Sequence, residues 1–213
     1  ITPASAGLTL YGPTAYSHQA DSPFAGLTMS YFHLEDFEDR LLNTPGVTVD
    51  TGYSTKPSYP ALYTDSVDGD DGILDCLGRD GNSWFAPSGT AGLTFTFDAG
   101  VLGALPTHAG IVWTDGLNPV TFQAYDASGT LLGTIGPHNL ADGNFAGGTC
   151  EDRFFGISDC GGIWKIRITS GASGIEVDHL QYGHETCVPV PGAALLGTLG
   201  LSVAGWRLRR KIA

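Results

Sequence analysis

The sequence predicts an all-β fold: an antiparallel β-sandwich of the jelly-roll type, followed by a single C-terminal hydrophobic helix. Short stretches alternate apolar with polar residues, turn-forming residues separate them, and no helical periodicity precedes residue 188. Alternation with a period of two places apolar side chains on one face of a strand, whereas an amphipathic helix repeats about every 3.6 residues. Several short strands separated by turns are typical of a sandwich, and we favour the jelly-roll version.

Five stretches carry the strand pattern. Residues 93–97, 120–124 and 164–168 alternate, residues 111–113 form a short apolar run typical of a buried strand, and residues 175–182 indicate a last strand. Gly, Asp and Ser occupy the intervening turns, at residues 98–100, 115–116, 126–129 and 170–174. Glycine accepts positive φ, and Asp and Ser bond their own backbone, so these residues favour tight turns.

Two consecutive phenylalanines, Phe154 and Phe155, need a separate explanation. Successive side chains of a regular strand point to opposite faces, so both cannot point into one core. Either one ring is exposed as a ligand platform or interface, or a β-bulge buries both. We favour the bulge.

The chain divides into three predicted parts. Residues 24–185 form the sandwich domain, which is long enough to bury a core. Residues 1–23 are less patterned and form either a loosely packed leader or an added edge strand. Residues 186–213 form a tail of different charge: residues 1–185 hold all 22 acidic residues and six basic ones, a formal −16, whereas four basic residues crowd into the last seven positions.

The acidic body excludes nucleic acid as a partner, because phosphate binding depends on Lys and Arg. Two explanations of the charge stay open. The body binds divalent cations in a cation-rich exterior, or the charge serves solubility alone.

Four cysteines form no CxxC pair, so the sequence does not indicate a zinc ribbon. Cys150 and Cys160 flank a short loop and are the predicted disulfide in an oxidising compartment. Cys76 and Cys187 are then left for a second bridge. Four cysteines allow three connectivities, and all three stay open at this point.

The C-terminal tail has the composition of a membrane helix. No charge occurs in residues 186–206, and a helix over residues 192–206 would be about 22 Å long. Including residues 188–191 brings it close to the hydrocarbon core of about 30 Å. Trp206 lies where an interfacial aromatic would, and the terminal basic cluster should stay cytoplasmic, with the acidic domain outside. The alternative, a helix docked on the sandwich, should show a polar face, and this segment offers only Thr198 and Ser202.

This tail resembles the PEP-CTERM sorting tail: a proline motif, a short apolar helix and a basic end. Val190 stands between the prolines where the family usually has Glu, as in its Val-Pro-x-Pro variants. The resemblance implies an exosortase, a membrane-embedded processing enzyme, that recognises the motif and releases or transfers the domain to the surface or matrix of a polysaccharide-producing Gram-negative bacterium. The matching residues are Val188, Pro189, Val190 and Pro191, the apolar residues 192–206, and Arg207, Arg209, Arg210 and Lys211.

Carboxylates crowd into residues 35–39, and Asp178 interrupts the apolar pattern of the last strand. Close like charges repel unless water solvates them or a cation bridges them, and a bare buried charge is costly. The pairing resembles carbohydrate-binding-module jelly rolls, many of which hold a structural calcium between an acidic first strand and an Asp of the last. That resemblance implies Glu35, Glu38 and Asp178 as Ca²⁺ ligands. A solvated strand end and a hydrogen-bonded structural Asp are the alternatives.

Residues 65–75 are a second acidic segment and resemble an irregular calcium loop. Asp recurs at alternate positions, and Gly provides the turn. The segment departs from the EF-hand pattern, because Cys76 stands at the twelfth position, where a Glu is needed, and no flanking helices are indicated. The predicted ligands are Asp65, Asp68, Asp70 and Asp75. A plain exposed turn is the alternative.

No catalytic motif indicates an enzyme: GxSxG, HExxH and the P-loop are absent. We therefore expect a non-catalytic surface or matrix protein, stabilised by calcium and binding extracellular polysaccharide. A purely structural or adhesive role is the alternative to polysaccharide binding. The candidate sugar-stacking residues, in loops rich in Gly, Pro and Ser, are Tyr53, Tyr59, Tyr63 and Trp84, which could instead pack those loops. The rival hypothesis is an extracellular polysaccharide-active enzyme, since paired carboxylates can hydrolyse glycosides.

Overall fold

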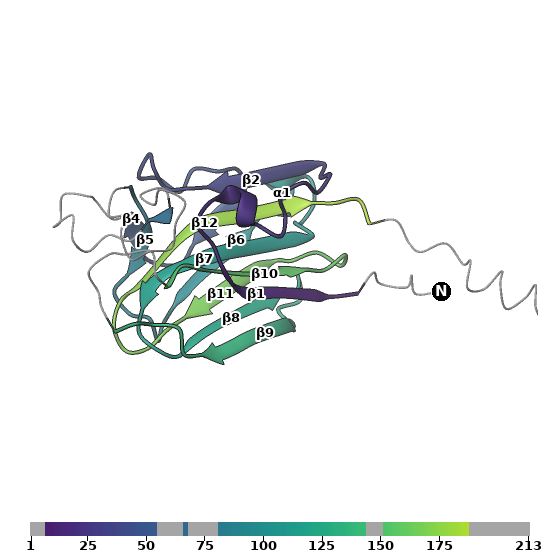
Figure 1. Ribbon diagram of the computed structural model, residues 1–213. Coiled ribbons are helices and arrows are strands. Elements are labelled where there is room, and N and C mark those ends of the chain that lie inside the picture. The colour runs from purple at the N-terminus through teal and green to yellow at the C-terminus, as the bar shows by residue number, and fades with distance from the viewer. Residues whose placement is uncertain (1–6, 55–65, 68–80, 144–150, 188–213) are drawn as a thin grey trace, which may run out of the picture. The chain divides into compact units, whose positions relative to one another are not determined.

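Two antiparallel β-sheets make up the described part of the chain, as the alternating sequence pattern predicts (Figure 1). The computed structural model describes residues 7–54, 66–67, 81–143 and 151–187. Within that part, the helices described in full are η1 (Gln19–Asp21) and α1 (Ala99–Leu102), each about a turn long. Residues Gly7–Thr186 form one compact unit.

The larger sheet has seven strands. They run in the order β1 (Thr9–Ala15), β10 (Arg153–Ser158), β7 (His108–Gly116), β12 (Ile175–His184), β5 (Trp84–Ala86) and β4 (Tyr53–Ser54), and β2 (Tyr31–Glu35) also pairs with β12. The last strand, β12, is therefore central: β7 flanks one side, and β5 and β2 share the other.

The smaller sheet has five strands. Their order is β3 (Val47–Val49), β6 (Leu93–Phe97), β11 (Lys165–Thr169), β8 (Val120–Tyr125) and β9 (Leu131–His138). Buried and partly exposed residues alternate strictly along β6, β11 and β8. This alternation confirms the strands predicted near residues 93–97, 120–124 and 164–168, because their apolar residues face the other sheet.

The main core lies between the two sheets. Phe95, Phe122, Ile166 and Ile168 of the smaller sheet meet Trp113 and other apolar side chains of the larger one, all essentially inaccessible to water. Burial of these aromatic and branched side chains is the dominant stabilising term, at roughly 1.5–3 kcal/mol for each fully buried side chain.

A second, smaller cluster covers the outer face of the larger sheet. It contains Tyr16, Phe24, Val67, Val112 and Phe154. Phe154 stacks on Tyr16 at 5.9 Å and meets Phe24 edge-on at 5.4 Å between ring centroids. The larger sheet is thus buried on both of its faces in this region.

This second cluster corrects the expected bulge at Phe154 and Phe155. Both rings are buried, but the ladder between β10 and β7 is regular, and the rings lie on opposite faces: Phe155 in the main core and Phe154 in the outer cluster. Gly110 and Gly156 are directly paired beside Phe154, and an added Cβ would lie 2.3 Å and 2.7 Å from its ring atoms. The two glycines therefore make room for the ring.

A β-bulge does occur in β12. Its register with β7 shifts between Asp178 and Gln181, and His179 adopts φ +43°, a conformation that non-glycine residues rarely take. Asp178 and His179 both contact residues of the outer cluster, while Leu180 packs into the main core. The bulge thus aims two consecutive polar side chains away from the main core.

The N-terminal segment was expected to be either a leader or an edge strand. Thr9–Ala15 forms β1, which pairs with β10 at the edge of the larger sheet. The predicted C-terminal helix and sorting tail lie outside the described residues. Among the residues that are described, no helix is long and apolar enough to cross a membrane.

Core packing gives a first test. Phe122→Ala should lower the free energy of unfolding by about 3–5 kcal/mol, because it leaves a cavity between the sheets. Leu131→Ala removes a side chain that is 48% exposed at the start of β9, and should change stability by no more than about 0.5 kcal/mol. Urea unfolding followed by tryptophan fluorescence measures both. Equal losses would contradict the assigned core.

Candidate functional site

Glu35, a predicted calcium ligand, organises the loop that follows β2. Its carboxylate accepts hydrogen bonds from the backbone N–H groups of Phe37 (3.2 Å), Asn43 (2.9 Å) and Thr44 (3.0 Å), and from the Thr44 hydroxyl (3.1 Å). Only 3% of the residue is exposed. Both carboxylate oxygens are thus used to close the loop of residues 36–44, which accounts for a charge at a buried position.

Glu38 and Asp178, the other two predicted ligands of this cluster, converge on Ser66. The Ser66 hydroxyl lies 3.1 Å from Asp178 Oδ2 and 3.4 Å from Glu38 Oε1. Asp178 Oδ2 also accepts from the Val67 N–H at 2.9 Å, and Asp178 Oδ1 from the His179 N–H at 2.7 Å. A hydroxyl has one proton, so Ser66 can donate to only one of the two carboxylates at a time.

This contact joins two features that the sequence presents separately. Ser66 belongs to the acidic segment of residues 65–75, whereas Glu38 follows β2 and Asp178 lies in β12. Asp65, Asp68, Asp70 and Asp75 lie outside the described residues, so their role as ligands stays a prediction. Among the residues described, no group of three or more His, Cys, Asp or Glu side chains is arranged to hold a metal ion.

An open groove of about 450 Å³ lies where β3, β4 and β5 meet. It brings together Tyr53 and Trp84, two of the four predicted sugar-stacking residues. The other residues that line it are Arg40, Leu41, Leu42, Val47, Thr48, Val49, Gly52 and Ser54. Tyr59 and Tyr63 lie outside the described part of the chain.

The two aromatic residues of the groove have different environments. Trp84 packs against Phe37 at 5.4 Å between ring centroids, and its Nε1 donates to the Thr51 carbonyl at 3.0 Å. Tyr53 is 58% exposed and leans on Phe85 from the neighbouring strand. Trp84 therefore lines the groove and also packs against the main core, whereas most of Tyr53 is available to a ligand. Leu41, 56% exposed, adds apolar surface to the same groove.

A second pair of carboxyl groups, Asp115 and Glu151, was missed by sequence reasoning. Asp115 lies near the end of β7 and Glu151 just before β10, and their side chains are hydrogen-bonded to each other. Glu151 Oε2 also accepts from the Asp142 N–H at 2.7 Å. Only the antiparallel pairing of β7 with β10 brings these acids together, and nothing in their spacing along the chain predicts that pairing.

Burial makes this pair hold protons tightly. Loss of solvation is the main cause that raises the pKa of Glu151 to about 9, with further contributions from Asp115 and Asp142. Loss of solvation likewise raises the pKa of Asp115 to about 6. A hydrogen bond between two carboxyl groups requires a proton on one of them. Glu151 is therefore the protonated partner near neutral pH.

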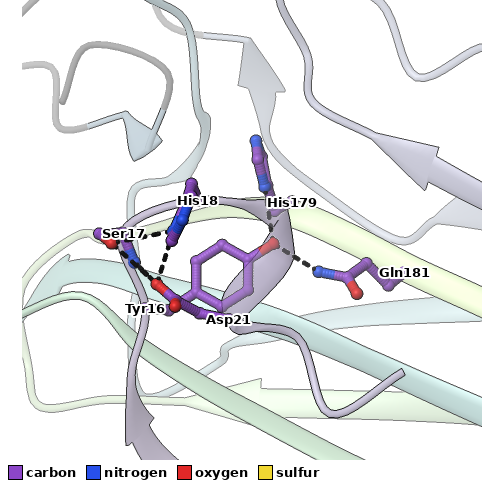
Figure 2. Close-up of polar contacts among 6 residues, drawn as sticks. All are labelled: Tyr16, Ser17, His18, Asp21, His179 and Gln181. Atoms are coloured by element: carbon purple, nitrogen blue, oxygen red, sulfur yellow. Dashed lines mark hydrogen bonds and ion pairs between the residues drawn. The ribbon is translucent and has the colours of Figure 1, made fainter. Parts of the chain in front are cut away.

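Serine, histidine and aspartate also meet on the surface, but without the geometry of a catalytic triad (Figure 2). Ser17 Oγ and Asp21 Oδ2 both contact the same ring nitrogen, His18 Nδ1, at 3.1 Å and 2.8 Å. A triad instead places the nucleophile and the acid on opposite nitrogens of the ring. Asp21 also accepts from the Ser17 N–H at 2.9 Å, so the cluster closes the turn around η1.

The buried neighbours of this turn form a structural network, of which Figure 2 draws Tyr16, His179 and Gln181. The Tyr16 hydroxyl lies 3.0 Å from His179 Nδ1 and accepts from Gln181 Nε2 at 2.9 Å. The Ser22 hydroxyl donates to Gln181 Oε1 at 2.5 Å. All four residues are at least nine-tenths buried. The network pairs the polar side chains of β12 with the N-terminal segment.

Of the predicted disulfide Cys150–Cys160, the structure describes one residue. Cys160 and Cys187 each take part in a disulfide bond, and none of the described cysteines is free. Cys150 lies outside the described residues, so its pairing with Cys160 stays a prediction.

The carboxyl pair predicts a specific dependence of stability on pH. Both folded-state pKa values are raised, so the proton is bound more tightly in the folded state, and stability is lost as the pH rises from about 4.5 towards 9. Glu151→Gln keeps a neutral hydrogen-bonding group and should raise the melting temperature at pH 8 by about 5 °C or more, with little change at pH 5. Thermal melts in chelator at both pH values measure this, with Asp126→Asn, in an exposed turn, as control. If the melting temperatures of Glu151→Gln and the parent protein differ by the same amount at pH 5 and at pH 8, the predicted pH dependence is wrong.

Comparison with known proteins gives no family. No family model matches the chain, and no curated protein matches it. Among solved structures, the enzymatically active domain of tailspike protein 4 of bacteriophage CBA120 shows a weak similarity, with 16% identity and a TM-score of 0.27. The match covers 81% of this chain and 22% of that chain. Its TM-score is too low to indicate a shared fold or function.

Proposed function

We propose that this chain is an exported, non-catalytic surface or matrix protein whose β-sandwich, of jelly-roll type, binds a glycan and is stabilised by calcium. The observation that carries the proposal is the open groove whose lining includes both the exposed Tyr53 and Trp84. Open clefts with an aromatic wall suit sugars, because an aromatic ring offers apolar area to the C–H face of a sugar and keeps a polar tip.

The groove has features of a binding surface besides its aromatics. Leu41 and Tyr53 leave more than half of their area in water, although both are large apolar side chains. Both line the groove, so the groove exposes apolar surface, as ligand and partner sites commonly do. Thr48 and Ser54 provide hydroxyls in the same lining, so sugar hydroxyls have polar partners there.

Calcium is proposed at the meeting point of Glu38, Ser66 and Asp178. Two carboxylates share one hydroxyl there, and Asp65 and Asp68 flank Ser66 and Val67 in the sequence. A divalent cation would neutralise repulsion between carboxylates this close together, and oxygen donors are the ligands that calcium prefers. Bound there, the ion would link the loop after β2, the acidic segment and β12.

Export and sorting are proposed from the tail sequence. An exosortase-type enzyme would recognise residues 188–191, while the apolar segment anchors the precursor in the membrane with the acidic domain outside. An acidic domain that binds glycan and calcium fits an exterior rich in cations and polysaccharide.

Glycan binding is tested with the full chain in a detergent that has no sugar head group. Among a panel of soluble neutral and acidic polysaccharides, at least one should bind, and Tyr53→Ala should weaken that binding about tenfold through the lost stacking surface. Tyr125→Ala makes the same change outside the groove and should leave binding intact. Isothermal titration measures affinity. Release of oligosaccharides would instead favour the polysaccharide-active enzyme.

Calcium binding is tested by thermal melts of the full chain in calcium and after chelation. Calcium at about 100 times its dissociation constant should stabilise the fold by about 2.7 kcal/mol, a rise of roughly 5–10 °C. Glu38→Gln should reduce this rise strongly, while Asp126→Asn should retain it. A rise kept in Glu38→Gln and lost in Glu151→Gln would place the ion at the other carboxyl pair and contradict the proposal.

A further inference from the structure

Arg40 is the charged side chain of the groove. Among the described residues that line it, the other nine are apolar, aromatic, hydroxylic or glycine, and none is acidic. This is unusual for a domain with a formal charge of −16 over residues 1–185. The groove therefore offers an anion a local cation without a carboxylate in the lining.

The guanidinium of Arg40 is hydrogen-bonded to Asn82 through Nε, and that contact does not use its two terminal nitrogens. Its Nε donates to Asn82 Oδ1 at 3.2 Å. Asn82 is itself fixed, because its Nδ2 donates to the Glu38 carbonyl and carboxylate at 3.2 Å and 3.3 Å. The Nε contact leaves both terminal nitrogens, Nη1 and Nη2, for a ligand. None of the described carboxylates forms an ion pair with this side chain.

The backbone at Arg40 supports a role beyond loop formation. Its φ is +69°, in the left-handed region that favours glycine or asparagine, and its N–H donates to the Phe37 carbonyl at 2.7 Å in a tight turn. Glycine would adopt this backbone conformation at a lower cost in energy than arginine does, so the turn itself does not require an arginine. Strained non-glycine positions cluster at functional sites, where the side chain gives the benefit.

From this geometry we propose that the groove takes an acidic glycan, and that Arg40 binds the carboxylate of a uronic acid unit. The inference rests on the proposed glycan-binding function and adds the class of ligand. A guanidinium presents two parallel N–H donors that match the two oxygens of a carboxylate, and Tyr53 supplies the face for a sugar ring. Charges of the negative body that lie farther from the groove than the Debye length, about 8 Å at physiological salt, are largely screened.

The test compares acidic oligosaccharides with their uncharged methyl esters on the full chain. Short oligogalacturonate and oligoalginate are titrated beside those esters in sodium chloride buffer, once with calcium and once with chelator, since calcium is proposed to stabilise the fold but would also bridge uronates to the protein's own carboxylates. At least one acid form should bind about tenfold or more tightly than its ester. Arg40→Gln should abolish that preference, and Arg40→Lys, which keeps the charge but loses the fork, should retain part of it.

Two controls separate the outcomes. Arg167→Gln removes an arginine of β11, outside the groove, and should keep the preference; an equal loss in both Gln variants would show unspecific attraction and overturn the role of Arg40. If the parent protein binds the acid and the ester with equal affinity, and Tyr53→Ala loses binding of both, the proposal of an acidic ligand is wrong. The proposed glycan-binding function would still stand. If no acidic or neutral glycan binds the parent protein, both proposals fail.

Discussion

The structure depends on the burial of β12, the central strand of a sheet that is covered on both faces by apolar clusters. Nine of its ten residues are buried, with strands on both sides and clusters of apolar residues above and below. Polar side chains on such a strand cannot turn to water, so each needs a partner from another part of the chain. The N-terminal segment supplies Tyr16 and Ser22, and the acidic segment supplies Ser66 and Val67. The polar residues of β12 thereby determine which distant segments cover the sheet.

The same constraint explains where charges collect. Asp178 and Glu38 both contact the Ser66 hydroxyl, and Asp115 and Glu151 meet where β7 and β10 lie side by side. Asp178 lies in the bulge of β12 and Glu151 just before β10, and both are buried, so each of these two carboxyl groups has little solvation. One answer to such crowding is a proton, and another is a divalent cation. At Glu151 the raised pKa keeps a proton on the carboxyl group. Near Asp178 we propose a calcium ion instead.

The groove differs from these carboxyl clusters because nothing among the described residues covers Tyr53 and Leu41. Short strands, β3 and β4, and the loop after β2 make up its walls, while Trp84 ties them to the core. A rigid floor with an exposed rim is what a binding surface for an extended polymer requires. Glu35 and Glu38 fix the loop that carries Arg40, so the stability of the fold and the shape of the groove depend on the same hydrogen bonds.

The sequence by itself determined the strands of the smaller sheet, since period-two alternation reflects one buried and one solvated face. It also identified Glu35, Glu38 and Asp178 as acids in unusual positions, and Tyr53 and Trp84 as loop aromatics. Only the tertiary structure decided that Glu35 closes a loop, that Ser66 joins Glu38 to Asp178, and that Asp115 pairs with Glu151. The physical reason is that alternation records how a strand faces a core but not which strands pair. The larger sheet is buried on both faces, so even its phenylalanine pair gave the wrong expectation of a bulge. Contacts between segments far apart in the sequence depend on strand order, which no local pattern encodes.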